Sequence, residues 1–388
     1  MTDVFDAIVI GAGIFGACTA YQLKKQGAGR VLLIDRDRPA SGVTGRSAGI
    51  VRQQYAHPLP VALARHAIDL FKVMPTELDA DFEYVQSGHC FLIGPDALEA
   101  VQRNLAMQRQ LGIDTTLVAG LGMHDLTGPL IRDGIAAVLY EKLAGYINPT
   151  SATEAHVAAF TRMGGILSPG TPVRSLSRVG DRITGIVTDG GPIEANLVIN
   201  AAGPWAAALA ASADIPMKLT VAREQVTTWR ASQRQYVPVA PLASGPDGIY
   251  LRPMGNQFVM VGRSFPKESE IVDPLRYKTS PDPETAADIR TRIHRRFHAL
   301  ADAAIASTRT LLCDDTADHY PYVGPRTGLA GYADACGGGS HGFKLAPAIA
   351  HELARWILTG RAEDDFADLS YDRLERGKLF ATAQDIAS

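Results

Sequence analysis

The chain has 388 residues, of which 46% are hydrophobic, and its formal net charge at pH 7 is −3. This length is too great for one ordinary core, so we expect two closely connected domains. Because no run of Lys or Arg stands out, neither nucleic acid nor an anionic membrane is an expected partner, and a small anionic substrate would need a local positive site.

The cysteines and the amino terminus bear on the compartment. Cys18, Cys90, Cys313 and Cys336 are scattered without metal-ligand spacing or an evident disulfide framework, so we predict no metal site and a reducing environment. The opening residues, MTDVFDAIVIGAG, carry no basic segment and no small-residue cleavage site. No later apolar run approaches the ~18 residues of a membrane span. We therefore expect a cytoplasmic protein without a transmembrane segment.

The first part of the chain predicts a βαβ unit. FDAIVI is typical of a buried strand, GAGIFG of a turn, ACTAYQLKKQG of a helix that ends at Gly27, and RVLLID of a second strand. A loop rich in Gly and Ser follows from Pro39 to Tyr55. Beyond it we predict a helix over about 60–78, a hairpin-like pair of strands in FEYVQSGHCFLIG, and a helix over about 97–112.

The rest of the chain alternates between predicted helices and short predicted strands. From Gly145 a turn and a helix precede short strands with Gly turns, and NLVINAAG is a further buried strand. Residues 216–315 show alternating strand patterns, with QFVMVGRSF the clearest, and a charged helix covers about 283–300. In the last part, the glycine loop ACGGGSHG opens a strongly periodic helix.

This order predicts a mixed α/β fold, with a discontinuous Rossmann-like dinucleotide domain and an interleaved substrate domain built on an antiparallel sheet. We assign residues 1–80, 145–215 and 316–375 to the first domain, 81–144 and 216–315 to the second, and 376–388 to a C-terminal tail.

The glycine turn is the first motif that carries chemistry. Gly11, Gly13 and Gly16 follow a strand and open a helix, and Asp35 ends the next strand. Glycines at this spacing allow a pyrophosphate to approach the helix amino end, and the acid can accept a hydrogen bond from a ribose hydroxyl. The pattern predicts a dinucleotide site.

Two further segments favour FAD over NAD. The Gly/Ser loop after the second strand and the loop from Cys336 to Gly342 suit a larger, buried ligand. The second loop precedes a helix whose free N–H groups favour negative charge, such as reduced flavin carries around its pyrimidine ring. We therefore predict FAD as the cofactor.

Taken together, the segments IVIGAGIFGACTAYQL, SGVTGRSAGIVRQQY, LVINAAGPWA, TADHYPYVG and GGGSHGFKLAPAIAHELA resemble the D-amino-acid oxidase superfamily of flavoproteins. Within it, they are similar to the branch of sarcosine, dimethylglycine and proline oxidases and dehydrogenases. The resemblance spans nearly the whole chain and keeps the motif order. It implies a flavin ring between the two domains and hydride transfer from the carbon next to the nitrogen of a small amino acid or N-substituted amino acid.

The resemblance also implies site residues. Arg52 and Lys344 match the positions that hold the substrate carboxylate, Tyr250 matches a pocket tyrosine, and His341 is expected to pack at the flavin edge. Arg252 is a weaker pocket candidate. The motifs and the resemblance together place the cofactor against Gly11, Gly13, Ile14, Phe15, Gly16, Asp35, Arg36, Thr44, Gly45, Arg46, Ser47, Val173, Ala202, Gly203, Trp205, Gly339, His341, Gly342, Phe343 and Lys344.

The chain departs from the family pattern at two positions. Leu311 stands where some sarcosine oxidases carry a cysteine bonded to the flavin, so we expect FAD to be held non-covalently. Met260 stands where an oxygen-activating lysine is found in those enzymes, which favours a dehydrogenase over an oxidase because methionine cannot stabilise superoxide electrostatically. The electron acceptor stays open between oxygen, a quinone and an electron-transfer protein.

Two other functions remain open on the sequence alone. Two cations that bind a carboxylate, as expected for Arg52 and Lys344, do not distinguish an amine from an alcohol on the neighbouring carbon. A 2-hydroxy-acid dehydrogenase on the same scaffold is therefore an alternative. A flavin-carrying subunit that only passes electrons within a larger complex is an alternative of another class.

Overall fold

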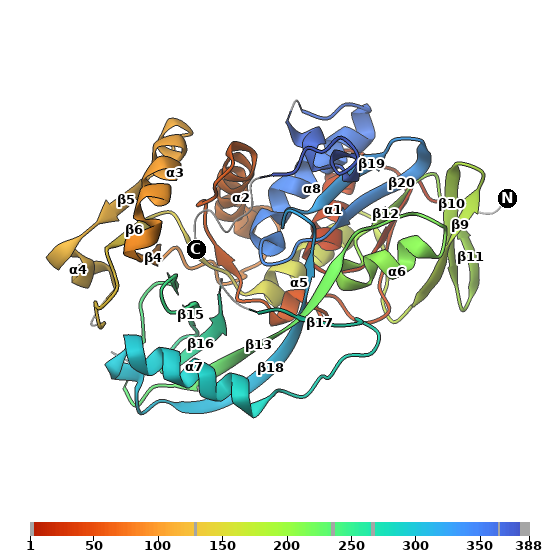
Figure 1. Ribbon diagram of the computed structural model, residues 1–388. Coiled ribbons are helices and arrows are strands. Elements are labelled where there is room, and N and C mark those ends of the chain that lie inside the picture. The colour runs from red at the N-terminus through yellow and green to blue at the C-terminus, as the bar shows by residue number, and fades with distance from the viewer. Residues whose placement is uncertain (1–3, 128–129, 234–236, 265–267, 364, 381–388) are drawn as a thin grey trace.

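The computed structural model describes residues 4–127, 130–233, 237–264, 268–363 and 365–380. Two large sheets organise the molecule (Figure 1). In Figure 1, α1 and α8 lie beside one sheet, and α7 and α3 lie beside the other. The mixed α/β class predicted from the sequence is confirmed.

The first sheet has nine strands among the described residues, in the order β11-β10-β20-β12-β1-β2-β8, with β9 beside β10 and β19 beside β20. Its centre is parallel, whereas β9, β11 and β19 pair antiparallel with their neighbours. The strands are β1 (Ala7–Ile10), β2 (Val31–Ile34), β8 (Ile166–Ser168), β9 (Val173–Val179), β10 (Arg182–Thr188), β11 (Gly191–Glu194), β12 (Val198–Asn200), β19 (Tyr322–Arg326) and β20 (Leu329–Cys336).

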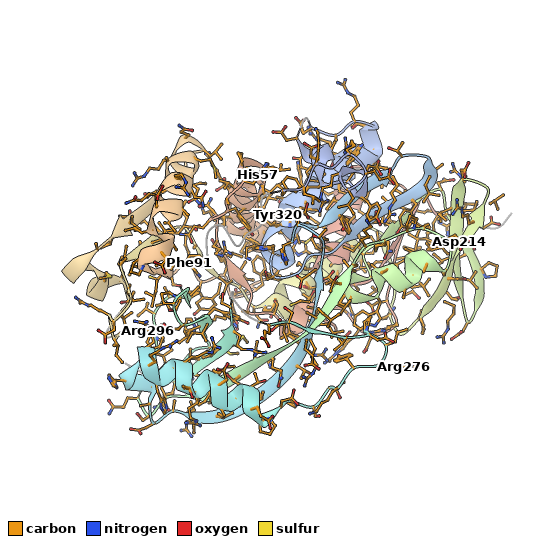
Figure 2. The ribbon with its side chains drawn as sticks, viewed as in Figure 1. His57, Phe91, Asp214, Arg276, Arg296 and Tyr320 are labelled. Atoms are coloured by element: carbon orange, nitrogen blue, oxygen red, sulfur yellow. The ribbon has the colours of Figure 1, made fainter. Side chains whose placement is uncertain are left out.

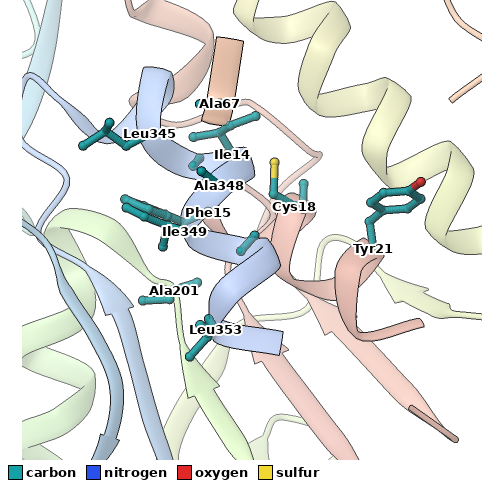
Figure 3. Close-up of a cluster of buried hydrophobic side chains, with 14 of the residues drawn as sticks. Ile14, Phe15, Cys18, Tyr21, Ala67, Ala201, Leu345, Ala348, Ile349 and Leu353 are labelled. Carbon is teal, nitrogen blue, oxygen red and sulfur yellow. The ribbon is translucent and has the colours of Figure 1, made fainter. Parts of the chain in front are cut away.

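The apolar runs in β1 and β2 follow from burial on both faces of this sheet. Ala7 and Val9 join one hydrophobic cluster, while Ile8 and Ile10 join another on the opposite face. Four helices cover the first face: α1 (Ile14–Lys25), α2 (Pro58–Glu77), α5 (Pro149–Arg162) and α8 (Gly342–Thr359). Figure 3 shows apolar side chains of α1 and α8, among them Cys18 and Ala348, gathered in this cluster where the two helices pack against each other. The short helix α6 (Ala206–Ala211) contributes to the cluster on the other face.

The second sheet also has nine strands in the described part of the chain and is mostly antiparallel, in the order β17-β13-β16-β15-β14-β4-β6-β5, with β18 beside β13. Only the β14–β4 pairing within it is parallel. Its strands are β4 (His89–Ile93), β5 (Thr115–Val118), β6 (Ala137–Glu141), β13 (Thr220–Arg230), β14 (Leu242–Ser244), β15 (Ile249–Pro253), β16 (Phe258–Arg263), β17 (Glu270–Ile271) and β18 (Ala304–Asp315).

Helices and a small ribbon complete this half. Residues of α7 (Pro283–Arg296) bury Ile289 and Ile293 against one face of the second sheet, and α3 (Leu98–Gln110) buries Val101 and Leu105 against the other. The short helix α4 (Met123–Thr127) precedes β6. Strands β3 (Ile50–Val51) and β7 (Gly145–Tyr146) form a separate two-stranded ribbon where the chain passes between the sheets.

Three predicted helices are found close to their expected limits, as α2, α3 and α7. The hairpin-like pair of strands in FEYVQSGHCFLIG is wrong: only β4 forms there, and Val85 makes an isolated bridge to Tyr146. The cause is tertiary, because β4 finds its partners in β6 and β14.

The strands of the first sheet come from 7–34, 166–200 and 322–336, and those of the second from 89–141 and 220–315. The division into two interleaved domains with the limits given above stays a proposal. Of the proposed tail, residues 381–388 lie outside the described residues.

Candidate active site and cofactor site

A cavity of about 940 Å³ is lined by residues of both sheets. Its wall includes the ends of β1 and β2, the start of α1, the loop after β2, parts of β13, β15 and β18, and the start of α8. Most of the predicted site residues lie in this wall: Gly11, Gly13, Ile14, Phe15, Asp35, Arg36, Thr44, Arg46, Ser47, Arg52, Val173, Ala202, Gly203, Trp205, Tyr250, Gly339, His341, Gly342, Phe343 and Lys344.

The glycine turn is shaped by close backbone approaches. Gly11 has φ +103°, and a Cβ there would lie 2.4 Å from the carbonyl oxygen of Ala201. A Cβ on Gly16 would lie 1.8 Å from the carbonyl oxygen of Gly11, so this glycine packs the helix against the turn and is not itself in the cavity wall. Gly13 is the N-cap of α1 and offers no side-chain cap. The amino end of α1 therefore faces the cavity as a positive helix end without a cap from the N-cap residue itself.

Asp35 lies at the end of β2, where its carboxylate serves the turn as well as the cavity. One oxygen accepts the Ala12 amide at 2.6 Å and the other accepts the Asp37 amide at 2.9 Å. Burial raises the pKa of Asp35, and the amides of Ala12 and Asp37 oppose the rise. Since a carboxylate offers about four lone-pair positions, acceptor capacity remains for ribose hydroxyls.

Beside Asp35, the cavity has an aromatic wall. The Arg36 guanidinium lies 3.8 Å from the centre of the Trp205 ring, and the Trp205 indole donates to the carbonyl of Pro274 at 3.1 Å. Val173 lies in the same wall. A flat, partly cationic surface of this kind suits an aromatic base.

The loop after β2 contributes Thr44, Arg46 and Ser47 to the wall. The Thr44 hydroxyl accepts the Ile14 amide at 3.1 Å, which ties the loop to the start of α1. Gly45 points away from the cavity, because a Cβ there would lie 2.4 Å from the carbonyl oxygen of Ala40. It allows the loop to turn.

Several N–H groups of the glycine loop before α8 have partners within the protein. The Asp314 carboxylate accepts the amides of Gly337, Gly338 and Gly339 at 2.8, 3.2 and 3.3 Å. The amides of His341 and Gly342 donate to the carbonyl of Gly338. These N–H groups are therefore not free to bind a negative ligand. The sequence prediction concerned the free N–H groups of the helix that follows, of which the Gly342 amide is used within the loop. A buried acid that the sequence analysis did not single out binds the three glycine amides.

Arg52 and Lys344 come together from distant parts of the chain. The Arg52 guanidinium carbon lies 5.2 Å from the centre of the Tyr55 ring and 5.1 Å from that of Phe91, and the Lys344 ammonium lies 6.0 Å from the Tyr55 ring. Each donates to a main-chain carbonyl, Arg52 to that of Gln54 and Lys344 to that of Ser340 at 3.0 Å. Burial, followed by repulsion from Arg52, holds the pKa of Lys344 well below its usual range.

His341 packs between aromatic rings. Its ring centre lies 5.3 Å from that of Tyr55 and 5.8 Å from that of Tyr320, with the Tyr320 ring nearly parallel. Burial, then Lys344 and Arg52, hold its pKa well below the ordinary value. A histidine so perturbed is neutral and a weak base, which fits a packing role.

Tyr250 and Leu311 lie on the side of the cavity formed by the second sheet, and Met260 packs against Leu311. A Cβ on Gly262 would lie 2.5 Å from the Tyr250 ring, so the ring is seated on the bare backbone of β16. Leu311 and Cys313 line the cavity, while Met260 packs behind it with Leu311 and Val226. Arg252 is not in the wall: its guanidinium lies 4.7 Å from the Tyr146 ring.

Sequence reasoning missed several polar residues at this site. His89 and Glu224 line the cavity, as does Asp314, and the buried Glu141 lies behind it. Figure 2 labels two neighbours of this site: Phe91, which lines the cavity with His89, and Tyr320, which stacks on His341. The available signal was a charged or polar side chain inside an apolar strand, as in HCFLI and AVLYE. Such residues cost free energy when buried and invite a functional reason.

The described residues contain no cluster of three or more His, Cys, Asp or Glu side chains arranged to hold a metal ion. They also contain no helix with the length and apolar character needed to cross a bilayer.

The residues present fit a flavin dinucleotide. The amino end of α1, an acid at the end of β2 and an aromatic surface all line a cavity that also includes the Arg52 and Lys344 cations. The model of the FAD dependent oxidoreductase family (DAO) matches residues 6–356. The chain belongs to this family. The resemblance stated from the sequence motifs is thereby confirmed, and the protein is an FAD-dependent oxidoreductase.

Relatives within the family differ in size and activity. The chain is 26% identical to FAD-dependent oxidoreductase domain-containing protein 1 of Bos taurus, over 92% of this chain and 81% of the relative. It is also 26% identical to the mitochondrial sarcosine dehydrogenase of Homo sapiens, over 93% of this chain but only 40% of that protein. Among solved structures, L-proline dehydrogenase from P. horikoshii superposes with a TM-score of 0.90 at 25% identity, covering 98% of this chain and 100% of the other.

Proposed function

We propose that this flavoprotein oxidises the carbon–nitrogen bond of a small amino acid or N-substituted amino acid. The observation that carries the proposal is the pair of cations Arg52 and Lys344, which approach the same Tyr55 ring at the wall of the cavity that fits FAD. Both hydrogen-bond to main-chain carbonyls. A substrate carboxylate would supply the negative charge that this corner of the cavity is built to receive.

Each residue has a distinct task in this reading. Arg52 gives a planar pair of donors to the carboxylate, and Lys344 adds a compact positive charge. Tyr250, His89 and Phe91 line the cavity and exclude water from the reacting carbon. Bound FAD supplies a two-electron acceptor for the hydride. The chain's own contribution is therefore proximity and orientation, which can account for much of the rate enhancement.

The chemical balance needs no further reactant at this stage. The substrate, with its nitrogen deprotonated, loses a hydride from the neighbouring carbon and becomes an imine. Water then hydrolyses the imine to an amine and a carbonyl compound, unless the imine is cyclic and stable.

The relatives support this substrate class. Sarcosine and proline, for which two of these proteins are named, each join a carboxylate and a secondary amine through one carbon. The 4-methylaminobutanoate oxidase of Paenarthrobacter nicotinovorans, 26% identical over 94% of this chain and 45% of that protein, is named for another N-methyl amino acid. At such identities the individual substrate is not transferable. The chain also spans less than half of two of these proteins.

For the electron acceptor, we propose a dehydrogenase that uses a quinone, a dye or an electron-transfer protein more readily than oxygen. Met260 is buried with Val226 and Leu311, so the β16 position where a cation would assist oxygen is apolar. We also propose that FAD is held non-covalently, because Leu311 offers no nucleophile.

Anaerobic bleaching of the flavin tests the proposed function. The isolated holoprotein is mixed with sarcosine, dimethylglycine, proline, D-amino acids or 2-hydroxyglutarate, and the absorbance of oxidised flavin is followed. We expect bleaching by an amino acid, with an amine or imine as product. Bleaching by the hydroxy acid alone would favour the 2-hydroxy-acid dehydrogenase, and bleaching by none of them the electron-transfer subunit.

A further inference from the structure

A buried carboxylate lies close to Arg52 and Lys344 and has no role in the oxidation proposed for this site. Glu141 is the last residue of β6 and has 0% of its surface exposed. Its two oxygens accept the backbone amide of Gln53 at 2.8 and 2.9 Å. Because Gln53 follows Arg52 directly, Glu141 ties the segment that carries Arg52 to the second sheet.

Glu141 is also the anion of a buried charge cluster. Arg52 and Lys344 both interact with it electrostatically. The other titratable groups that face this cluster are Tyr55 beside Arg52, Tyr84 before β4, His89 on β4 and His341 at the start of α8. His89 is the cross-strand partner of Glu141 in the β4–β6 pairing.

The charged groups of this cluster are Arg52, Lys344 and Glu141, because the other titratable side chains around them are neutral. Burial holds the pKa values of His89 and His341 well below the ordinary value, so both rings are neutral. Burial raises the pKa values of Tyr55 and Tyr84, so both phenols are neutral as well. With Lys344 protonated and Glu141 ionised, the cluster carries one net positive charge, which a substrate carboxylate would neutralise.

We propose that Glu141 is a positioning residue for the substrate carboxylate, which orients Arg52 through the Gln53 amide and keeps Lys344 protonated. The inference rests on the proposed function and names the group that sets its pH range. Burial raises the pKa of Glu141 to about 7 against the opposing effects of the Gln53 amide and Arg52. Conversely, the negative charge of Glu141 raises the pKa of Lys344. The two groups therefore titrate as a coupled pair.

The substitution Glu141→Gln separates charge from shape. Glutamine keeps an oxygen that can accept the Gln53 amide but carries no charge. An opposite charge at close range shifts a pKa by roughly 1–3 units, so its removal should move the loss of Lys344 protonation to lower pH by at least about one unit.

The test measures the affinity of acetate, an unreactive carboxylate, for the holoenzyme between pH 6 and 10 by the change in flavin absorbance. In the parent protein, acetate affinity should fall as Glu141 ionises at about pH 7 and fall again, in an alkaline limb, as Lys344 loses its proton. In E141Q the first fall should be absent, and the alkaline limb should begin at least about one unit lower. At pH 6, where Glu141 is mostly protonated in the parent, E141Q should bind acetate about as tightly as the parent.

Control variants give the outcomes separate meanings. E352Q makes the same chemical change on α8, in a residue whose carboxylate pairs with Arg355 at 3.0 Å, and should leave the profile unchanged. E141D keeps the charge and should keep the alkaline limb near its parental position. An equal loss of affinity for E141Q at every pH would overturn the proposal. A purely structural contact would give such a loss, because its effect does not depend on the protonation of Lys344.

A second measurement applies if E141Q does not retain its flavin. In Lys344→Met the alkaline limb should vanish, and acetate affinity should still fall as Glu141 ionises beside Arg52. Because the charge of Lys344 lowers the pKa of Glu141, this fall should lie above pH 7 in the variant. A pH-independent affinity in K344M would overturn the proposal. If neither K344M nor R52A changed acetate binding or turnover, the proposed function itself would fail, whatever E141Q did.

Discussion

Arg52 and Lys344, which we call the carboxylate clamp, give the sharpest prediction about the proposed function. Arg52→Ala and Lys344→Met should each leave a folded, yellow protein whose kcat/KM for its amino acid falls steeply. Lys344 is only 7% exposed, and the Arg52 guanidinium lies between the rings of Tyr55 and Phe91. A carboxylate bound there would be largely removed from water, where charge pairs are strong.

The size of the loss follows from that burial. Removing one partner of a desolvated, hydrogen-bonded charge pair costs about 2–5 kcal/mol, which is roughly 30-fold to several thousand-fold in kcat/KM. An exposed ion pair contributes about 0–1 kcal/mol. Lys72→Met provides the matched control, because Lys72 is a solvent-exposed cation on α2 that pairs with Asp69 at 3.3 Å. It should change kcat/KM by no more than about fivefold.

The assay is steady-state turnover with an artificial dye, with the acid substrate and its amide compared in parallel. The amide should be a poor substrate of the parent protein and should lose far less activity than the acid in either variant, since it has no charge for the clamp to hold. Equal losses for acid and amide would refute the reasoning: Arg52 and Lys344 would then support the flavin or the fold.

Three further predictions concern the cofactor, the acceptor and stability. Acid or heat should release intact FAD, because Leu311 offers no nucleophile; flavin that stays on the denatured chain would direct attention to Cys313, which lines the cavity. Reduced enzyme should be reoxidised by air more slowly than by a dye or quinone, and reoxidation by air as fast as turnover would show that the apolar Met260 position does not limit oxygen. Burial raises the pKa of Asp314 to about 6, so the folded state holds this proton more tightly than the unfolded state does. Its contribution to stability, about 3 kcal/mol, is therefore present below about pH 4 and is lost as pH rises through 6, so the fall in Tm between pH 4.5 and 7.5 should be shallower in Asp314→Asn than in the parent protein.

Local chemistry in the sequence was sufficient for the βαβ unit and the nucleotide turn. Alternate residues of β1 and β2 are buried on opposite faces of one sheet, and a strand buried on both faces has to be a continuous apolar run. Gly16 is required by a backbone approach to Gly11 within the turn itself, and Gly11 has a left-handed φ of +103° that favours glycine. Such features depend on few distant contacts, so they can be predicted from the sequence.

The substrate side depended on pairing that no local pattern records. The segment FEYVQSGHCFLIG has the apolar residues of two strands, yet only β4 forms, because its partners β6 and β14 come from later parts of the chain. That pairing places His89 opposite Glu141 and brings the carboxylate to the amide behind Arg52.

The same distinction separates the two halves of the candidate site. The sequence by itself determined the family, the cofactor class and the positions of Arg52 and Lys344 as candidate ligands for a carboxylate. Only the tertiary structure decided that both cations meet at Tyr55, that Asp314 uses the amides of the glycine loop, and that a buried Glu141 stands behind the clamp. The physical reason is that hydrogen bonds and buried charges act over a few ångströms in space, and the chain brings these groups together from segments that are far apart in sequence.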